Sequence, residues 1–220
     1  MPESVHTGSI PVWTVFFVKK LTKILVTSIL LFSLFWLGGI IFDRQQLDNN
    51  LIRLHVVANS DSEADQAVKL QVRDAIVSSL QPDMQKISGI AEAKEYLCGK
   101  LQQLEEVANV ALAASGSSSR AVVTLEKEAF PTRDYETFSL PAGVYESLRV
   151  TIGEGAGKNW WCVVFPSLCL PAAGKDMTDV AAGAGFSDPL TDTLQQKEGY
   201  EIRFFLLDCL GWLQNLFFRG

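Results

Sequence analysis

The sequence predicts an α+β fold class: an N-terminal membrane-spanning helix, then a single domain of strand, two helices and an antiparallel set of strands, with a C-terminal amphipathic helix. Two observations predict it: a charge-free apolar segment at residues 24–42, and strand-like and helix-like periodicities after it in that order. The 220 residues allow one domain of ordinary size beside these terminal helices. The expected parts are a cytoplasmic tail (1–23), a transmembrane helix or signal anchor (24–42), an exported α+β domain (43–170), a linker (171–199) and the C-terminal helix (200–220).

The apolar segment ILVTSILLFSLFWLGGIIF has a length suited to a membrane. Its 19 residues are close to the roughly 20 that a helix needs to cross a bilayer. Lys19, Lys20 and Lys23 precede it and Asp43 follows it. Because basic residues stay on the cytoplasmic side, we expect the N-terminus in the cytoplasm and everything after Asp43 outside it.

The same segment is also compared with a secretory signal, which ends at small residues in an A-x-A-like pattern. Its best small residues, Gly38 and Gly39, directly follow Trp36 and Leu37 and make a poor cleavage site. An uncleaved anchor is therefore favoured over a cleaved signal. The expected localisation is the cell membrane, or secretion where the segment is cleaved.

Charge excludes one class of partner. Without the first 42 residues, which hold three lysines and one acid, the net charge changes from −6 to −8. An acidic domain repels phosphate backbones, and no Lys/Arg cluster appears downstream of the apolar segment. Nucleic-acid binding is therefore not expected.

The domain begins with a β-branched, aliphatic stretch at residues 51–58, which predicts a buried strand. Ser60 and Glu63 fit a capping box, so a helix is expected from there to the Gln81-Pro82-Asp83 stretch. Apolar residues at helical spacing predict a second helix over residues 90–114.

Short strands are expected after these helices, at residues 121–125, 135–140, 148–152 and 160–165. The glycine-rich GEGAGKN between the last two indicates a turn that joins them as a hairpin. A phosphate-binding loop is disfavoured there, because a strand and not a helix N-terminus follows the glycines.

The C-terminal part changes in character. Residues 171–199 are rich in small residues and glycine, which is typical of a linker. Residues 202–218 are strongly apolar but contain Asp208, Gln214 and Asn215, so a second membrane span is disfavoured. An amphipathic helix that docks on the domain, on a membrane surface or on a partner fits better.

Candidate catalytic groups are few. His55, the one histidine after the apolar segment, lies in a predicted apolar strand, where a structural role is favoured over that of a catalytic base. Cys162 could serve as a nucleophile with His55, but a strand position after two tryptophans argues against a reactive thiolate. A disulfide between Cys162 and Cys169 is a candidate that the sequence leaves open. Cys98 and Cys209 are expected to be apolar packing residues.

No metal-ligand set has suitable spacing, and no cofactor is expected. Trp160 and Trp161 alternate faces of their strand, so one is expected in the core and the other on the surface as an anchor for a partner. Together with the turn Asn59, Ser60 and Asp61, they are the predicted partner-binding residues.

Three stretches carry a resemblance to a known family: RLHVVANSD (53–61), KLQVRDA (69–75) and the run from PAG (141–143) through LRV to GKNWWCVVFPSLC (157–169). Together they resemble stage II sporulation protein R of endospore-forming Gram-positive bacteria, over about residues 48–170 and more weakly over IRFFLLD. Two departures are Ser167, where the family commonly has a second proline, and an apolar, cysteine-containing C-terminal helix, where the family is more often charged.

The resemblance implies a signalling protein made in the forespore and exported into the space between the forespore and mother-cell membranes. There it would activate a membrane-embedded aspartic protease of the mother-cell membrane, which processes the precursor of the early mother-cell sigma factor. It also implies that the protein is not an enzyme. The alternatives are an exported cysteine hydrolase that uses Cys162 and His55, and a structural domain tethered to the membrane.

Overall fold

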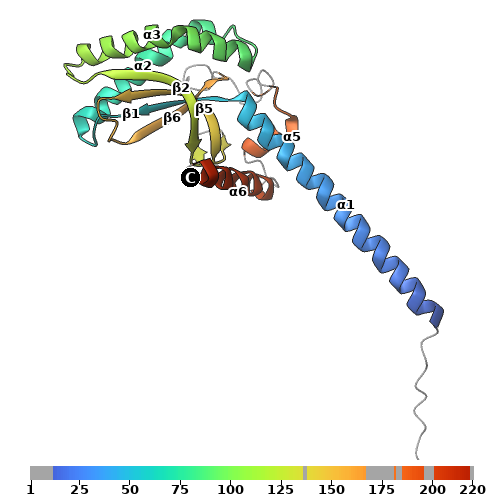
Figure 1. Cartoon of the computed structure of the whole chain (residues 1–220). Coiled ribbons are helices and arrows are strands. Elements are labelled where there is room, and N and C mark those ends of the chain that lie inside the picture. Colours follow the sequence, from blue (N-terminus) through green and yellow to red (C-terminus); the bar gives the residue numbers. More distant parts are fainter. Residues whose placement is uncertain (1–11, 136–137, 167–180, 182–184, 196–200, 219–220) are drawn as a thin grey trace, which may run out of the picture. The chain divides into compact units, whose positions relative to one another are not determined.

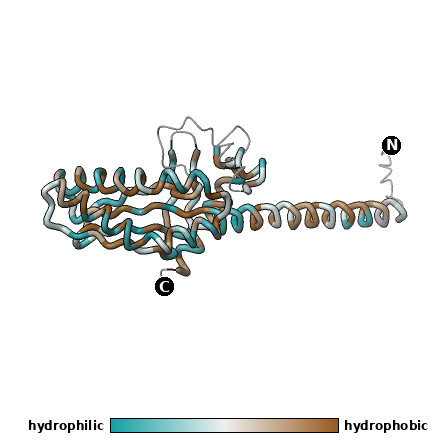
Figure 2. Tube along the Cα trace, turned by 90° about the horizontal axis from the view of Figure 1, so that it is seen from above, coloured by the Kyte–Doolittle hydropathy of each residue, from teal (hydrophilic) through white to brown (hydrophobic). Residues whose placement is uncertain are grey.

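The computed structural model describes residues 12–135, 138–166, 181, 185–195 and 201–218. It divides into two compact units, residues 1–41 and 42–220, which are described separately. Helix α1 (Val12–Asn50) runs through the first unit and into the second. Hydrophobic residues recur along it in Figure 2. Among the described residues it is the one helix long and apolar enough to cross a membrane.

The second unit is built on a four-stranded sheet in the order β2-β5-β1-β6. Strands β1 (Ile52–Val57) and β5 (Gly143–Ile152) are parallel, whereas β2 (Ala121–Phe130) and β6 (Asn159–Phe165) pair antiparallel with their neighbours. A separate two-stranded ribbon consists of β3 (Arg133–Asp134) and β4 (Ser139–Leu140). The α+β fold class predicted from the sequence is confirmed.

One face of the sheet is covered by α2 (Glu63–Met84) and α3 (Ile90–Ala114), as Figure 1 shows. The core lies between them, where Leu54 and Val56 of β1 meet Val72 and Ile76 of α2 and Leu104 of α3. All five side chains are almost fully buried. Because side chains alternate along a strand, residues 53 and 55 point to the opposite face, which we call the outer face.

The predicted hairpin between β5 and β6 is wrong, because β1 lies between these two strands. Neighbouring strands are about 4.8 Å apart, so the connection must cover about 10 Å. The glycine-rich loop 153–158 does this by crossing the C-terminal end of β1, where Gly157 N donates to Ala58 O and Ala156 N to Asn59 O. A strand-turn-strand pattern looks the same in sequence whether the strands pair or a third strand separates them.

The ends of α2 also differ from the prediction. Its N-cap is Ser62, whose hydroxyl accepts from Asp65 N, and Pro82 lies inside the helix. Residues 188–194, within the predicted linker, form the short helix α5 (Asp188–Leu194), with Leu190 and Leu194 buried. The predicted C-terminal helix corresponds to α6 (Glu201–Phe218).

We predict that Gly157→Ala destabilises the domain. A Cβ at this position would lie 2.2 Å from the Ser60 carbonyl oxygen, so the crossing loop would have to move away from β1. Overpacking of this kind costs about 1–3 kcal/mol, measured as a decrease in the free energy of unfolding in urea.

Gly99→Ala is the matched control, because a Cβ there meets nothing within 4 Å and the position is helical. It should instead stabilise the domain by up to about 1 kcal/mol. An unchanged free energy of unfolding for Gly157→Ala would contradict the tight crossing.

Candidate functional site

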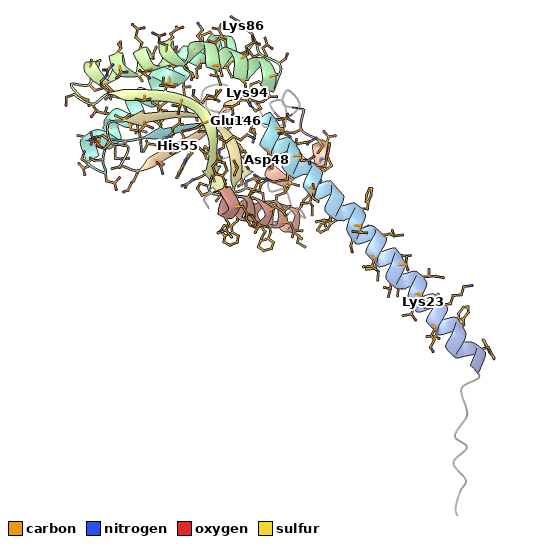
Figure 3. The ribbon with its side chains drawn as sticks, viewed as in Figure 1. Lys23, Asp48, His55, Lys86, Lys94 and Glu146 are labelled. Atoms are coloured by element: carbon orange, nitrogen blue, oxygen red, sulfur yellow. The ribbon has the colours of Figure 1, made fainter. Side chains whose placement is uncertain are left out.

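Polar and aromatic side chains gather on the outer face of the sheet, away from α2 and α3. His55 of β1 and Lys94 of α3 lie on opposite sides of the sheet in Figure 3. The outer-face cluster consists of side chains from β1, β2, β3, β5 and β6: Arg53, His55, Glu128, Phe130, Arg133, Tyr145, Arg149 and Trp161.

Glu128 connects two side chains of this cluster, His55 and Arg149. Nδ1 of His55 lies 3.1 Å from each of its carboxylate oxygens, and Nη1 of Arg149 donates to Oε1 at 2.6 Å. Only 12% of the Glu128 side chain is exposed, so these bonds are shielded from water. Burial by itself raises the pKa of Glu128, but hydrogen bonding from His55 and the positive charge of Arg149 outweigh burial and hold this pKa below its ordinary value.

Trp161 is contacted by two neighbouring side chains, His55 and Arg133. The His55 ring stacks on it with centroids 5.7 Å apart, and the guanidinium carbon of Arg133 lies 3.8 Å from its ring centroid. Such stacking and cation–π contacts orient the indole without a hydrogen bond. Because Trp161 and Arg133 are both half-buried, part of each side chain remains open to a partner.

Arg53 is fully buried beside aromatic rings. Its guanidinium carbon lies 4.2 Å from the Phe130 ring centroid and 5.2 Å from that of Tyr145, and Nη2 donates to the Tyr135 hydroxyl. Within the described residues its Nε and Nη1 have no hydrogen-bond partner. An arginine in this environment binds through its planar face and leaves donors for a further acceptor.

The pairing of Cys162 with His55, which the hydrolase hypothesis needs, is wrong. In the β1–β6 register Cys162 is opposite Leu54 and Trp161 is opposite His55, so Cys162 and His55 lie on different faces of the sheet. Cys162 is buried in the core and disulfide-bonded. Cys169 lies outside the described residues, so the predicted Cys162–Cys169 pairing stays a prediction. Cys98 and Cys209 are exposed, contrary to the expectation that they pack in the interior.

The two predicted tryptophans do lie on different faces. Trp160 packs against the helix-covered core, with the Arg73 guanidinium 4.7 Å from its ring centroid, whereas Trp161 belongs to the outer face. No group of three or more histidine, cysteine or acidic residues that could hold a metal ion occurs in the described ranges.

The turn Asn59, Ser60 and Asp61 uses its side chains within the domain. The side-chain oxygen of Asn59 accepts from Glu154 N at 3.1 Å, and that of Asp61 accepts from Lys158 N at 2.7 Å. The Ser60 hydroxyl and the Asn59 amide both donate to Asp65 and lower its pKa. These bonds attach the turn to the crossing loop and to the start of α2. The turn therefore has a structural role at the C-terminal end of β1.

Sequence reasoning missed Arg53, Glu128, Arg133 and Arg149. A signal for the first was present: Arg53 and His55 are two residues apart in a strand otherwise apolar, which puts both on one face. Their partners come from strands 70 or more residues later, and nothing local in the sequence connects them to β1.

Comparison with known proteins gives the same family as the motifs. Residues 48–175 match the family described as Stage II sporulation protein R (spore_II_R). The chain belongs to this family. It is 31% identical over 189 residues to Stage II sporulation protein R of Bacillus subtilis (strain 168), which covers 78% of this chain and 83% of the relative. No solved structure matches the chain. The outer-face residues of β1, β2, β5 and β6 and the crossing loop all lie inside the matched range.

We predict that Glu128→Gln destabilises the domain at neutral pH by about 1.5–3 kcal/mol, the range for a hydrogen bond to a charged group. The pKa of Glu128 is lower in the folded than in the unfolded chain, so its contribution is present above about pH 4.5 and is lost as the pH falls through the folded-state pKa. Denaturant unfolding at pH 7 and at acidic pH should show a difference between wild type and variant that shrinks on acidification.

Glu126→Gln is the matched control, since Glu126 lies on the same strand and face but is exposed. Its effect should be small at every pH. If the Glu128→Gln variant unfolds like the Glu126→Gln variant, the Glu128 carboxylate does not stabilise the cluster.

Proposed function

We propose that this protein is an exported, non-catalytic signal of sporulation that activates a membrane-embedded aspartic protease. The protease then removes the pro-sequence from the precursor of the early mother-cell sigma factor. In this proposal the chain is made in the forespore and acts in the space between the forespore and mother-cell membranes. The observation that carries it is the family match over residues 48–175.

The N-terminal end supports the compartment. An apolar helix preceded by lysines is compatible with membrane insertion or with export by a signal peptide. The remainder of the chain is acidic, and this net charge disfavours nucleic-acid binding. Both features suit a domain that acts outside the cytoplasm of the cell that makes it.

The outer face supports a binding role. His55 is held by Glu128 and stacked on Trp161, and its pairing with Cys162 is excluded by the strand register. Tryptophan and arginine are among the residue types most enriched at the energetic centre of protein interfaces. We therefore propose Trp161 and Arg133 as the contact with the protease; binding there would favour its active conformation.

Contacts at Trp160, Asn59, Ser60 and Asp61 stay predictions. Trp160 is partly buried against the core, and the turn is occupied by hydrogen bonds within the domain. Substitutions at these four positions would disturb the fold and would not report on a partner alone.

The test is a reconstitution in a non-sporulating host. The full chain is co-expressed with the membrane protease and its pro-sigma substrate, and cleavage is followed by gel mobility. We expect cleavage when the chain is present, and none in its absence. A folded, exported chain that leaves the substrate uncleaved would contradict the proposed function.

In the same assay, Trp161→Ala should lower cleavage strongly. Loss of a central interface tryptophan costs about 2 kcal/mol or more, which weakens binding by about 30-fold. Val122→Ala is the control, because Val122 is an exposed residue at the far end of the same face. Equal cleavage by both variants, with both chains folded, would show that Trp161 is not part of the contact with the protease.

A further inference from the structure

The exposed side of α6 is apolar. Ile202, Phe205, Trp212, Leu213, Leu216 and Phe217 all project from this helix into solvent. Their spacing places them in one stripe along the helix. The exposed fraction of Trp212 is 62% and that of Phe217 is 76%. Such a contiguous patch of large side chains is rare on the free surface of a soluble domain.

The polar side of α6 is the side that contacts the domain. Asp208 accepts hydrogen bonds from Ala142 N, at 2.7 Å, and from the Thr132 hydroxyl, and Asn215 donates to the Phe130 carbonyl at 2.8 Å. Gly211 lies so close to Ala142 that a Cβ there would be 1.6 Å from its carbonyl oxygen. The domain is therefore contacted through polar groups, close backbone packing and the buried side chain of Leu207, and folding does not use the apolar stripe.

The same helix is connected to the residues that directly follow the apolar segment. Nε of Arg203 donates to Asp43 at 2.7 Å, and Nε2 of Gln214 donates to Asp48 at 2.9 Å. Figure 3 shows Asp48 beside α6. Asp43 is the next residue after Phe42, and at 1.5 Å per residue Asp48 lies about 9 Å beyond Phe42 along the helix. A bilayer that contains residues 24–42 therefore ends within one or two helical turns of these contacts.

From these observations we infer that α6 lies in the lipid interface, with its apolar stripe among the headgroups and upper acyl chains. The inference rests on the membrane placement in the proposed function and gives the domain a second membrane contact. Phenylalanine, tryptophan and leucine on one side of a helix are typical of this location. Arg203, the one basic residue of α6 within its described part, is paired with Asp43, so attraction to anionic headgroups contributes little.

Cys209 provides the probe, because it is free, exposed and on α6. A Cys98→Ser chain is labelled at Cys209 with an environment-sensitive fluorophore, without reductant so that the Cys162 disulfide stays intact. The chain is placed singly in phosphatidylcholine nanodiscs, whose two faces are both open to solvent. Quenching by iodide is compared with quenching by a phospholipid that carries a nitroxide on its acyl chain.

We expect strong quenching by the nitroxide lipid and several-fold weaker quenching by iodide than for a control label on Cys98 in a Cys209→Ser chain. Replacing part of the lipid with phosphatidylglycerol should change neither result. A Cys209 label that iodide quenches as it does the Cys98 label would overturn the inference and leave the stripe open for a protein partner. A label that neither reagent quenches would also overturn it, because the helix would then be covered by the chain itself.

A triple variant, Phe205→Ser, Trp212→Ser and Phe217→Ser, separates the stripe from the fold. Since the three side chains are exposed, circular dichroism should be unchanged while nitroxide quenching is lost. The exposed Val110→Ser substitution on α3 is the control and should retain it. No protease is present in the quenching experiment, so a negative result there does not contradict the proposed activation of the protease. A negative result in the reconstitution likewise does not contradict the membrane contact of α6.

Discussion

The backbone of β1 hydrogen-bonds to β5 on one side and to β6 on the other, and the positions of the other elements depend on this shared strand. Leu54 and Val56 point to the core under α2 and α3, while Arg53 and His55 point to the outer face. A register slip of one residue would exchange these two sets and bury Arg53 and His55 in the core. The crossing loop prevents such a slip, since it bonds to the backbone of Ala58 and Asn59 at the end of the strand.

Polar and charged side chains on a sheet face are tolerated only where they are paired or remain partly in water. On the outer face Glu128 supplies one negative charge to both His55 and Arg149, and aromatic rings supply their negative faces to Arg53 and Arg133. These contacts hold the side chains of the cluster together without a partner. Preorganisation of this kind lowers the entropic cost of binding a partner.

Elements determined by local periodicity could be predicted from the sequence: α3 begins and ends at the expected residues 90 and 114, and β1 lies within residues 51–58. The place of β1 in the sheet could not be predicted from the sequence, because pairing between distant strands leaves no local pattern. The contact between His55 and Glu128 is harder still. Glu128 is level with Tyr145 in the register whereas His55 is level with Arg149, and β2 and β5 curve in Figure 1. Helical spacing likewise predicts that α6 is amphipathic but not which side faces the domain.

Two membrane contacts have different consequences for signalling. A spanning helix holds a protein in one membrane effectively without release, whereas one interfacial helix binds reversibly. Under the proposed function, a chain that keeps residues 24–42 would stay in the membrane of the cell that made it and would have to reach the protease across the intervening space. A chain that loses this segment would keep α6 and, under the inferred interfacial placement, a reversible affinity for either membrane. Because a surface-bound ligand searches in two dimensions at a raised effective concentration, transfer to the membrane of the protease would increase activation without any new protein contact. On this argument the apolar stripe of α6 contributes most to signalling in the cleaved chain.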